Sequence, residues 1–301
     1  MSTKFNLMVS VDMITYNHEP YIKQAIEGVL MQKTNFPFEL VIGEDCSTDK
    51  TREICFKYKE KYPEKIKLLL PESNLGMTKN FISTLTAATG KYIALCEGDD
   101  YWTDPYKLQK QVDFLEANFD YSCCFHRYDI LDEETNLTRK DNIDFLFIDN
   151  NLSGCDISTE LFLTKWITQP LTMVFRKELL DIKSLEKYKF TRDQHLIYHL
   201  LQKGKAYLFA FNAGVYREHI GGIHGKQSHK HQCDIGVKVA KELFSFNKND
   251  ILLKDNYLRI LDWSISSYKK NKWNFKTQTV YILDCFLISK SIKKLIKQII
   301  R

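Results

Sequence analysis

The amino-acid sequence predicts an α/β protein with a mostly parallel central sheet flanked by helices. Three observations support this fold class. Apolar runs of strand length alternate with segments of helical periodicity through the amino-terminal third of the chain. Polar clusters follow the carboxyl ends of several of these runs, which is where open α/β sheets bind their ligands. The chain has 301 residues and is 44% hydrophobic, which suits one large α/β domain or a domain with an added C-terminal part.

The amino-terminal third alternates strands with helices. Strands are expected where apolar residues run together, at residues 7–14, 38–42, 66–70 and 92–96. Helices are expected where apolar residues recur at helical spacing, over residues 21–30, 54–61 and 79–88. Helices that connect successive strands are the usual crossovers of a parallel, doubly wound sheet.

An acidic cluster follows the fourth of these strands. The apolar run at residues 92–96 leads directly into three carboxylates, Glu97, Asp99 and Asp100. Carboxylates gathered at one sheet edge repel one another unless solvent or a cation compensates their charge. Oxygen ligands suit Mg²⁺ or Mn²⁺, particularly when a substrate adds phosphate oxygens. The alternative is an acidic turn before a helix that begins at Asp104-Pro105, a good N-cap and N1 pair.

The rest of the chain continues the pattern less regularly. A helix is expected over 106–118, a strand over 121–128, and an insertion or flexible loop over the polar segment 132–156. Helices are expected from residue 177 and from Asp193, and a strand is expected at 206–211. Helices are expected over 237–244 and 257–268, which gives a helical C-terminal extension.

Targeting and redox features are those of a cytoplasmic protein. The sequence has no run of eighteen apolar residues, and residues 1–11 lack the basic and apolar regions of a signal peptide. The eight cysteines include no C-x-x-C pair, which indicates reduced thiols rather than a disulfide framework or a zinc site. We therefore expect the chain to stay in the cytoplasm.

The basic character of the chain is concentrated in its tail. The net charge is +5, and residues 265–301 carry nine Lys and Arg against one acid. Ile288, Ile292, Leu295, Ile296 and Ile299 form an apolar stripe beside the lysines, which predicts a basic amphipathic helix. Such a helix binds the anionic inner leaflet of the plasma membrane or docks on protein. No basic surface interleaved with aromatic residues appears elsewhere, so no nucleic acid partner is expected.

Four short motifs occur in an order that resembles a known family. They read T-Y-N-H-E at 15–19, G-E-D-C-S-T-D at 43–49, N-L-G-M-T-K-N at 74–80 and C-E-G-D-D at 96–100. Their order and spacing resemble the amino-terminal half of the family 2 inverting glycosyltransferases, which have the Rossmann-like GT-A fold. V-Y-R-E-H at 215–219 resembles the Y-R-x-H element that closes this domain in relatives.

The resemblance implies a pocket for a nucleoside-diphosphate sugar. Asp45 matches the acid that reads the base of the nucleotide. Further nucleotide contacts are expected from the other motifs, namely from Thr15, Tyr16, Asn17, Glu19, Lys79, Asn80, Glu97 and Gly98. For Lys79 the alternative is an exposed lysine at a helix start.

The resemblance also implies a metal site and a catalytic base. Asp99 matches the final acid of the D-x-D metal motif, and Glu97 and His219 are expected to assist it in binding Mn²⁺ or Mg²⁺. Asp193 matches the base that takes a proton from the acceptor hydroxyl. Relatives often have Glu before this acid, where this chain has Arg192. The alternative role of Asp193 is that of a helix N-cap.

The predicted function is metal-dependent, inverting transfer of a sugar from a nucleoside-diphosphate sugar to a hydroxyl of a glycan or lipid-linked acceptor, in cell-surface polysaccharide biosynthesis. Residues 1–225 would form the GT-A domain, with a nucleotide-binding half at 1–105 and an acceptor half at 106–225, and residues 226–301 the helical extension. The alternatives are a sugar-nucleotide nucleotidyltransferase and a non-catalytic sugar-nucleotide-binding protein. A dinucleotide or P-loop protein is disfavoured, since neither glycine-rich fingerprint is present.

Overall fold

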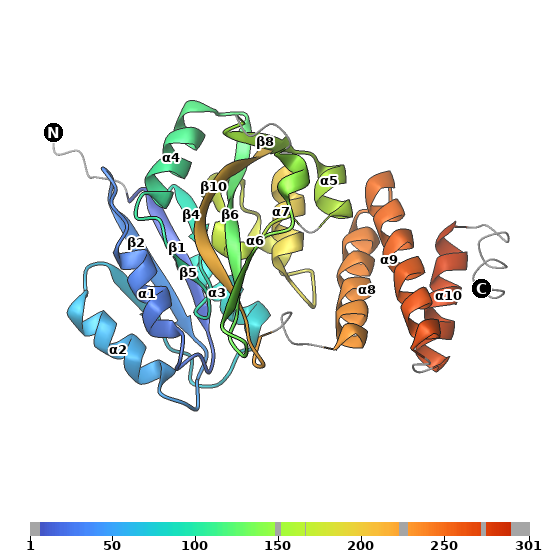
Figure 1. Ribbon diagram of the computed structural model, residues 1–301, viewed down its shortest axis with the longest axis horizontal. Helices are drawn as coiled ribbons and strands as arrows, with labels where there is room; N and C mark the ends of the chain where they lie inside the picture. Colours follow the sequence, from blue (N-terminus) through green and yellow to red (C-terminus); the bar gives the residue numbers. More distant parts are fainter. Residues whose placement is uncertain (1–6, 148–151, 166, 223–227, 272–274, 290–301) are drawn as a thin grey trace. The chain divides into compact units, whose positions relative to one another are not determined.

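The computed structural model of the protein describes residues 7–147, 152–165, 167–222, 228–271 and 275–289. The chain divides into two compact units. The first unit combines Met1–Ser158 with Ile167–His219, and the second combines Thr159–Trp166 with Ile220–Arg301. The central sheet belongs to the first unit (Figure 1).

The amino-terminal half of the sheet is parallel, which confirms the predicted fold class. Its strands are β1 (Val9–Thr15), β2 (Phe38–Glu44), β3 (Ile66–Leu69) and β4 (Tyr92–Leu95), in the order β3-β2-β1-β4. The connecting helices are α1 (Ile22–Leu30), α2 (Thr51–Lys61) and α3 (Met77–Ala87). Because β2 and β3 lie on one side of β1 and β4 on the other, the strand order reverses at β1. Sheets of this kind bind ligands at such a switch point.

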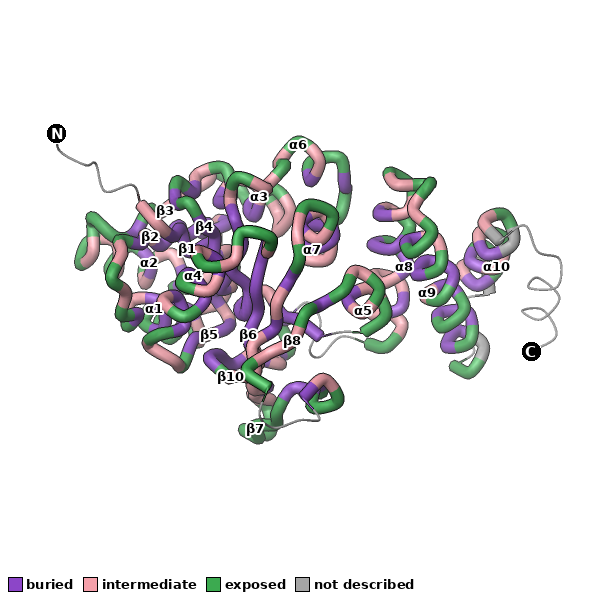
Figure 2. The backbone as a smooth tube through the Cα atoms, turned by 90° about the horizontal axis from the view of Figure 1, so that it is seen from above, coloured by how far each residue is buried: buried purple, intermediate pink, exposed green. Residues whose placement is uncertain are grey.

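The side chains of β1 alternate between the two faces of the sheet. Val9, Val11 and Met13 are fully buried in the core cluster to which α1 and α4 (Lys107–Ala117) also contribute. Asp12 points to the opposite face, where Thr84 of α3 is its hydrogen-bond partner. Figure 2 shows α1 and α4 on one side of β1 and β4, and α3 on the other. Each fully buried aliphatic side chain contributes ~1.5–3 kcal/mol, so β1 is strongly held.

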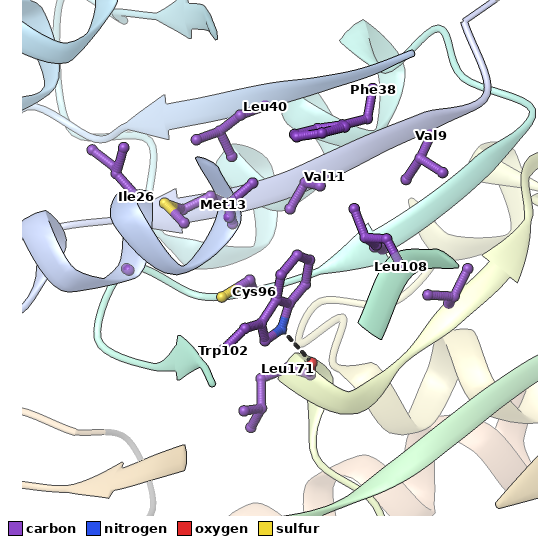
Figure 3. Packing of buried hydrophobic residues seen from close by; sticks show 14 of the residues in the cluster. Val9, Val11, Met13, Ile26, Phe38, Leu40, Cys96, Trp102, Leu108 and Leu171 are labelled. Carbon is purple, nitrogen blue, oxygen red and sulfur yellow. Dashed lines mark hydrogen bonds between the residues drawn. The ribbon is translucent and has the colours of Figure 1, made fainter. Parts of the chain in front are cut away.

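Trp102 fixes the segment that follows the acidic cluster. It lies in β5 (Tyr101–Trp102), is 2% exposed, and donates from Nε1 to the carbonyl oxygen of Leu171 at 2.8 Å (Figure 3). The Nζ atom of Lys107 lies 3.8 Å from the centroid of the Trp102 ring. Burial lowers the pKa of Lys107 to about 7. The π-face of Trp102 stabilises the charged form of the Lys107 side chain.

The second half of the sheet mixes strand directions. β9 (Val174–Arg176) is antiparallel to β4 and to β6 (Tyr121–Asp132), whereas β6 and β10 (Lys205–Glu218) are parallel. β5 pairs antiparallel with β10. The sheet is therefore mostly parallel around its centre, with antiparallel strands toward one side.

Two predictions for this region are wrong. The polar segment expected as a loop contains β7 (Leu137–Lys140), paired with β6, and β8 (Gly154–Ile157), paired with β10. These strands are held by backbone hydrogen bonds to long neighbours, so they need no apolar run. The helix expected from residue 177 is reduced to a 3₁₀ turn, η3 (Lys177–Leu179), and one short helix, α6 (Ile182–Leu185).

The second unit is helical, as predicted for the C-terminal part. Its helices are α5 (Thr159–Thr164), α8 (His229–Phe246), α9 (Ile251–Lys270) and α10 (Phe275–Ser289). The last three helices bury a core that includes Val237, Leu261 and Cys285. Asp234 accepts a hydrogen bond from Tyr281 at 2.8 Å and one from Tyr268, which ties the three helices together. In the described part of the chain, no helix is both long and apolar enough to cross a membrane.

Candidate active site

The carboxyl ends of β1, β2 and β4 meet at one edge of the sheet. Thr15 at the end of β1 pairs with Glu44 at the end of β2. Beyond the strands, the amide of Asp45 donates to the carbonyl of Thr15 at 3.0 Å, and the amide of Gly98 donates to that of Ile14 at 3.0 Å. These backbone hydrogen bonds join three of the sequence motifs into one surface at the switch point.

Asp99 lies beside two histidines at this edge. The Nε2 atom of His219 is 3.1 Å from Oδ2 of Asp99, and Nε2 of His18 is 3.6 Å from the same oxygen. His219 follows β10, is 5% exposed, and packs against Tyr21 with ring centroids 4.6 Å apart. The structure thus brings two predicted metal ligands together and adds a third residue from the first motif.

Gly98 permits the close approach of the first and fourth motifs. A Cβ atom at this position would lie 2.6 Å from Oγ1 of Thr15 and 3.1 Å from Nδ1 of His18. Both distances are shorter than ordinary contacts, so any side chain would displace Thr15 and His18. Gly98 therefore acts here through its lack of a side chain, and its predicted contact with a nucleotide stays a prediction.

The three carboxylates of the cluster have different electrostatic environments. Glu97, Asp99 and Asp100 offer oxygen atoms within 4.8 Å of one another. Burial and the charges of Asp99 and Asp193 raise the pKa of Glu97 to about 8. Burial and the charges of Asp99 and Glu97 raise the pKa of Asp100 well above its usual range. For Asp99, burial acts in the same direction, but His18 and His219 outweigh it and hold the pKa below its ordinary value.

This donor set fits a divalent cation. Carboxylate oxygens and imidazole nitrogens converge at Asp99, and burial lowers the pKa of His18, which favours the neutral, ligating form of its ring. A cation near Asp99 would also stabilise the ionised forms of Glu97 and Asp100, which burial disfavours.

Asp193 lies close enough to this cluster to affect it. It is the first residue of α7 (Asp193–Leu201), and its charge is among the causes that raise the pKa of Glu97. Burial raises the pKa of Asp193 itself, against the opposing effect of the Gln194 amide and of Arg192. The N-cap residue of α7 is Arg192, so the alternative of Asp193 as a helix N-cap is wrong.

Asp45 anchors a neighbouring loop. Its Oδ1 accepts from the amide of Leu75 at 2.7 Å, its Oδ2 accepts from the amide of Gly76 at 2.9 Å, and the residue is 2% exposed. Gly76 has φ of 77°, a left-handed conformation that favours glycine. The carboxylate of Asp45 thus holds the third motif against the second, and its base-reading role stays a prediction.

The polar side chains of the first motif also bind a neighbouring loop. Oδ1 of Asn17 accepts from the amide of Thr48 at 2.8 Å, and Oε2 of Glu19 accepts from the amide of Lys50 at 3.1 Å. Asn17 has φ of 54°, which asparagine tolerates better than most residues. Tyr16 is 43% exposed, and Asn17 is exposed as well. Contact with a nucleotide stays a prediction for Tyr16, Asn17 and Glu19.

Lys79 and Asn80 have different environments. Asn80 is 3% exposed and donates from Nδ2 to the carbonyl oxygen of Gly43 at 2.8 Å, which fixes α3 to the end of β2. Lys79 lies on the exposed side of the same helix, as its alternative interpretation anticipates. Contact with a nucleotide stays a prediction for both residues.

The different environments of Asn80 and Lys79 predict different effects of their substitution on stability. Asn80→Ala is expected to lower the free energy of unfolding by about 1–3 kcal/mol, because it leaves the buried carbonyl of Gly43 without its partner. Lys79→Ala is the matched control and is expected to change it by less than about 0.5 kcal/mol. Urea unfolding of both variants measures the difference. Equal stability of the two variants would contradict the structural role of Asn80.

Sequence reasoning did not single out two residues of this edge. His18 belongs to the first motif, but nothing in its local pattern shows that it faces Asp99, which is 81 positions away. Asp12 interrupts the apolar run of β1, where it is 3% exposed, and burial raises its pKa to about 8. An acid within a predicted buried strand was a detectable irregularity. The charge of Asp12 is among the causes that raise the pKa of Glu97.

A parallel sheet with an acidic cluster at its switch point and antiparallel strands beyond it is the GT-A fold of glycosyltransferases. The same architecture occurs in TarS of S. aureus, solved with UDP-GlcNAc, with a TM-score of 0.66 and 20% identity over 92% of this chain and 79% of that one. The mannosyltransferase PcManGT from Pyrobaculum calidifontis, solved with GDP-Man and Mn²⁺, gives a TM-score of 0.56 and 15% identity over 98% and 84% of the two chains.

The chain belongs to glycosyl transferase family 2, whose family model matches residues 10–182. An uncharacterized protein of Mycobacterium tuberculosis is 44% identical over 126 residues, which are 42% of this chain and 36% of that protein. A glycosyltransferase of Nostoc sp. is 27% identical over 90% of this chain and 84% of its own length. TuaG of Bacillus subtilis, named for teichuronic acid biosynthesis, is 37% identical over 41% of this chain and 46% of its own. The chain thus spans about a third of the length of the mycobacterial relative.

Proposed function

We propose that the protein is a metal-dependent, inverting glycosyltransferase that moves a hexosyl group from a nucleoside-diphosphate sugar to a hydroxyl of a glycan or lipid-linked glycan. The observation that carries the proposal is that Asp99 and two histidines meet at the switch point of the sheet, in an acidic cluster on which Asp193 acts. The charge of Asp193 acts on Glu97, which belongs to the same acidic cluster as Asp99. A base beside a cation site at a sheet's switch point is the arrangement that displacement of a diphosphate requires.

The chain's own residues perform two tasks in this mechanism. Asp193 takes the proton of the acceptor hydroxyl, whose oxygen forms a bond to the anomeric carbon while the bond from that carbon to the diphosphate oxygen breaks. Attack from the face opposite the leaving group inverts the configuration. Asp99 and His219, with Glu97 beside them, would hold a divalent ion, which when bound neutralises charge on the departing diphosphate.

The donor and acceptor classes are supported by the proteins to which the chain is similar. TarS and PcManGT were solved with UDP-GlcNAc and GDP-Man, respectively, so a nucleoside-diphosphate sugar is the proposed donor. Mn²⁺ in PcManGT supports Mn²⁺ or Mg²⁺ as the cofactor. TuaG is named for teichuronic acid biosynthesis, which supports a role in cell-surface polysaccharide biosynthesis.

The direct test is incubation with a panel of nucleotide sugars and Mn²⁺. The expected result is release of free nucleoside diphosphate from one donor, faster when an acceptor glycan is present. A nucleotidyltransferase would instead release pyrophosphate from a nucleoside triphosphate and a sugar phosphate. Donor binding without release under all conditions would favour the non-catalytic alternative and refute the proposal.

We also propose that the helical extension contacts an anionic membrane surface, so that the enzyme is peripheral on the cytoplasmic face. Val280, Leu283 and Leu287 are 47%, 52% and 66% exposed and lie on one face of α10. The nine basic residues of 265–301 complement anionic lipid. Of the predicted apolar stripe, Ile288 packs against the helical core, and Ile292, Leu295, Ile296 and Ile299 lie outside the described residues.

Deleting residues 286–301 is expected to release the protein from vesicles that contain anionic lipid, because it removes Leu287 and five of these basic residues. Leu283→Ser with Leu287→Ser is expected to weaken the same binding without unfolding the protein, since both side chains are exposed. Vesicle co-sedimentation measures both effects, and Ile251→Ser, 72% exposed on α9, is the control. Undiminished co-sedimentation of the deleted form would refute the membrane role.

A further inference from the structure

The two histidines beside Asp99 are arranged as ligands of a single ion. One ring nitrogen of His18, one of His219 and a carboxylate oxygen of Asp99 all lie within 4.8 Å of one another. Ligand bonds of about 2.1 Å place neighbouring ligand atoms ~3.0 Å apart in an octahedron and ~3.4 Å apart in a tetrahedron. The distances from Asp99 Oδ2 to His219 and His18, 3.1 and 3.6 Å, are close to these separations.

His18 is held in place for this task by a partner behind it. Its Nδ1 lies 3.2 Å from Oγ1 of Thr15, a residue that is 2% exposed. A hydrogen bond at one ring nitrogen fixes the orientation of the ring and directs the other nitrogen toward the metal. The backbone amide of His18 donates to Oγ1 of Thr51 at 2.8 Å, which fixes the main chain as well.

The competing ligand set is less suited to an ion. It consists of Glu97, Asp99 and Asp100, three carboxylates on one short loop. Oδ1 of Asp100 already accepts from the amide of Arg217 at 2.9 Å, and Asp100 is 1% exposed. Three carboxylates would favour Mg²⁺, whereas two imidazoles with one carboxylate favour Mn²⁺, Co²⁺ or Zn²⁺.

We propose that His18 ligates the same cation as Asp99 and His219, and that this set of two histidines and one carboxylate selects a transition-metal ion over Mg²⁺. The role of this metal ion in sugar transfer rests on the proposed function. The binding of the ion by these three residues does not. The proposal assigns His18, rather than Glu97, as the third protein ligand. It also predicts metal binding before any sugar nucleotide is present.

The test is metal titration of the full chain without nucleotide. Loss of the spectrum of free Mn²⁺ in electron paramagnetic resonance measures Mn²⁺ binding, and competition with Mg²⁺ measures selectivity. His18→Gln and His219→Gln are each expected to weaken Mn²⁺ binding at least about tenfold. Loss of a residue that only hydrogen-bonds to a metal ligand already weakens metal binding ~10–100-fold. Mg²⁺ affinity is expected to change much less. Thr15→Val is expected to weaken Mn²⁺ binding in the same direction, because it removes the partner of Nδ1.

The control is His231→Gln, an exposed histidine at the start of α8, which is expected to bind Mn²⁺ like the wild type. Wild-type Mn²⁺ affinity in His18→Gln overturns the proposal, and so does Mn²⁺ binding that requires nucleotide, because three protein ligands hold an ion without substrate oxygens. Failure of the proposed function is a separate outcome. It would appear as binding of Mn²⁺ that depends on His18, with no turnover of any nucleotide sugar.

Discussion

Asp99→Asn is expected to lower the rate of sugar transfer roughly 10²–10³-fold, the scale of losing an electrostatic stabiliser of a departing charged group. Asn keeps the volume of the side chain and removes its negative charge. Two imidazoles and the backbone of the fourth motif would remain, but the shared anionic ligand between His18 and His219 would be gone. Divalent ions are therefore expected to lose their effect on nucleotide affinity in this variant.

The measurement combines turnover with nucleotide titration, in the presence and absence of Mn²⁺. Asp113→Asn is the matched control, since Asp113 is exposed on α4 and its side chain accepts a hydrogen bond from Gln109 of the same helix. It is expected to behave like the wild type in both assays. Wild-type turnover in Asp99→Asn, or Mn²⁺ stimulation that survives the substitution, would contradict the assigned role.

The parallel part of the fold was predictable because buried strands are rich in apolar residues, which local sequence patterns reveal. Strand β4 is covered on both faces, and all four of its residues are apolar and buried. Strand β1 is buried as well, although Ser10 and Asp12 stand between its apolar residues. Strand β7 has no apolar run, since all four of its residues are exposed and it is held by backbone pairing with β6. Long-range pairing of this kind cannot be derived from local periodicity.

The site was predictable where a motif and a strand end coincide. Asp99 and Asp45 follow buried strands, so their place at the sheet edge follows from the topology. Partners across the fold could not be derived in this way. His18 reaches Asp99 because Gly98 lets two loops approach, and Asp45 bonds to amides of a loop thirty residues later. Such contacts depend on side-chain directions that only the folded chain fixes.

Asp193→Asn is expected to reduce transfer by roughly 10²–10⁴-fold, the usual contribution of a general base. Nucleotide binding in the presence of Mn²⁺ is expected to persist, because Asp99, His18 and His219 are unchanged. This separates Asp193 from Asp99, whose replacement removes both properties. Glu186→Gln, an exposed acid just after α6, is the matched control. Loss of Mn²⁺-dependent nucleotide binding in Asp193→Asn would place Asp193 in the cation site instead.

The pH dependence of transfer provides an independent test of the same residue. A base acts in its ionised form, so activity falls as the pH drops through its pKa. Burial raises the pKa of Asp193 above its ordinary value of 3.8, which moves this acidic limb toward neutral pH. At saturating Mn²⁺ the limb is expected in the wild type and absent from the residual activity of Asp193→Asn. An identical acidic limb in both proteins would show that another group, such as Glu97, controls it.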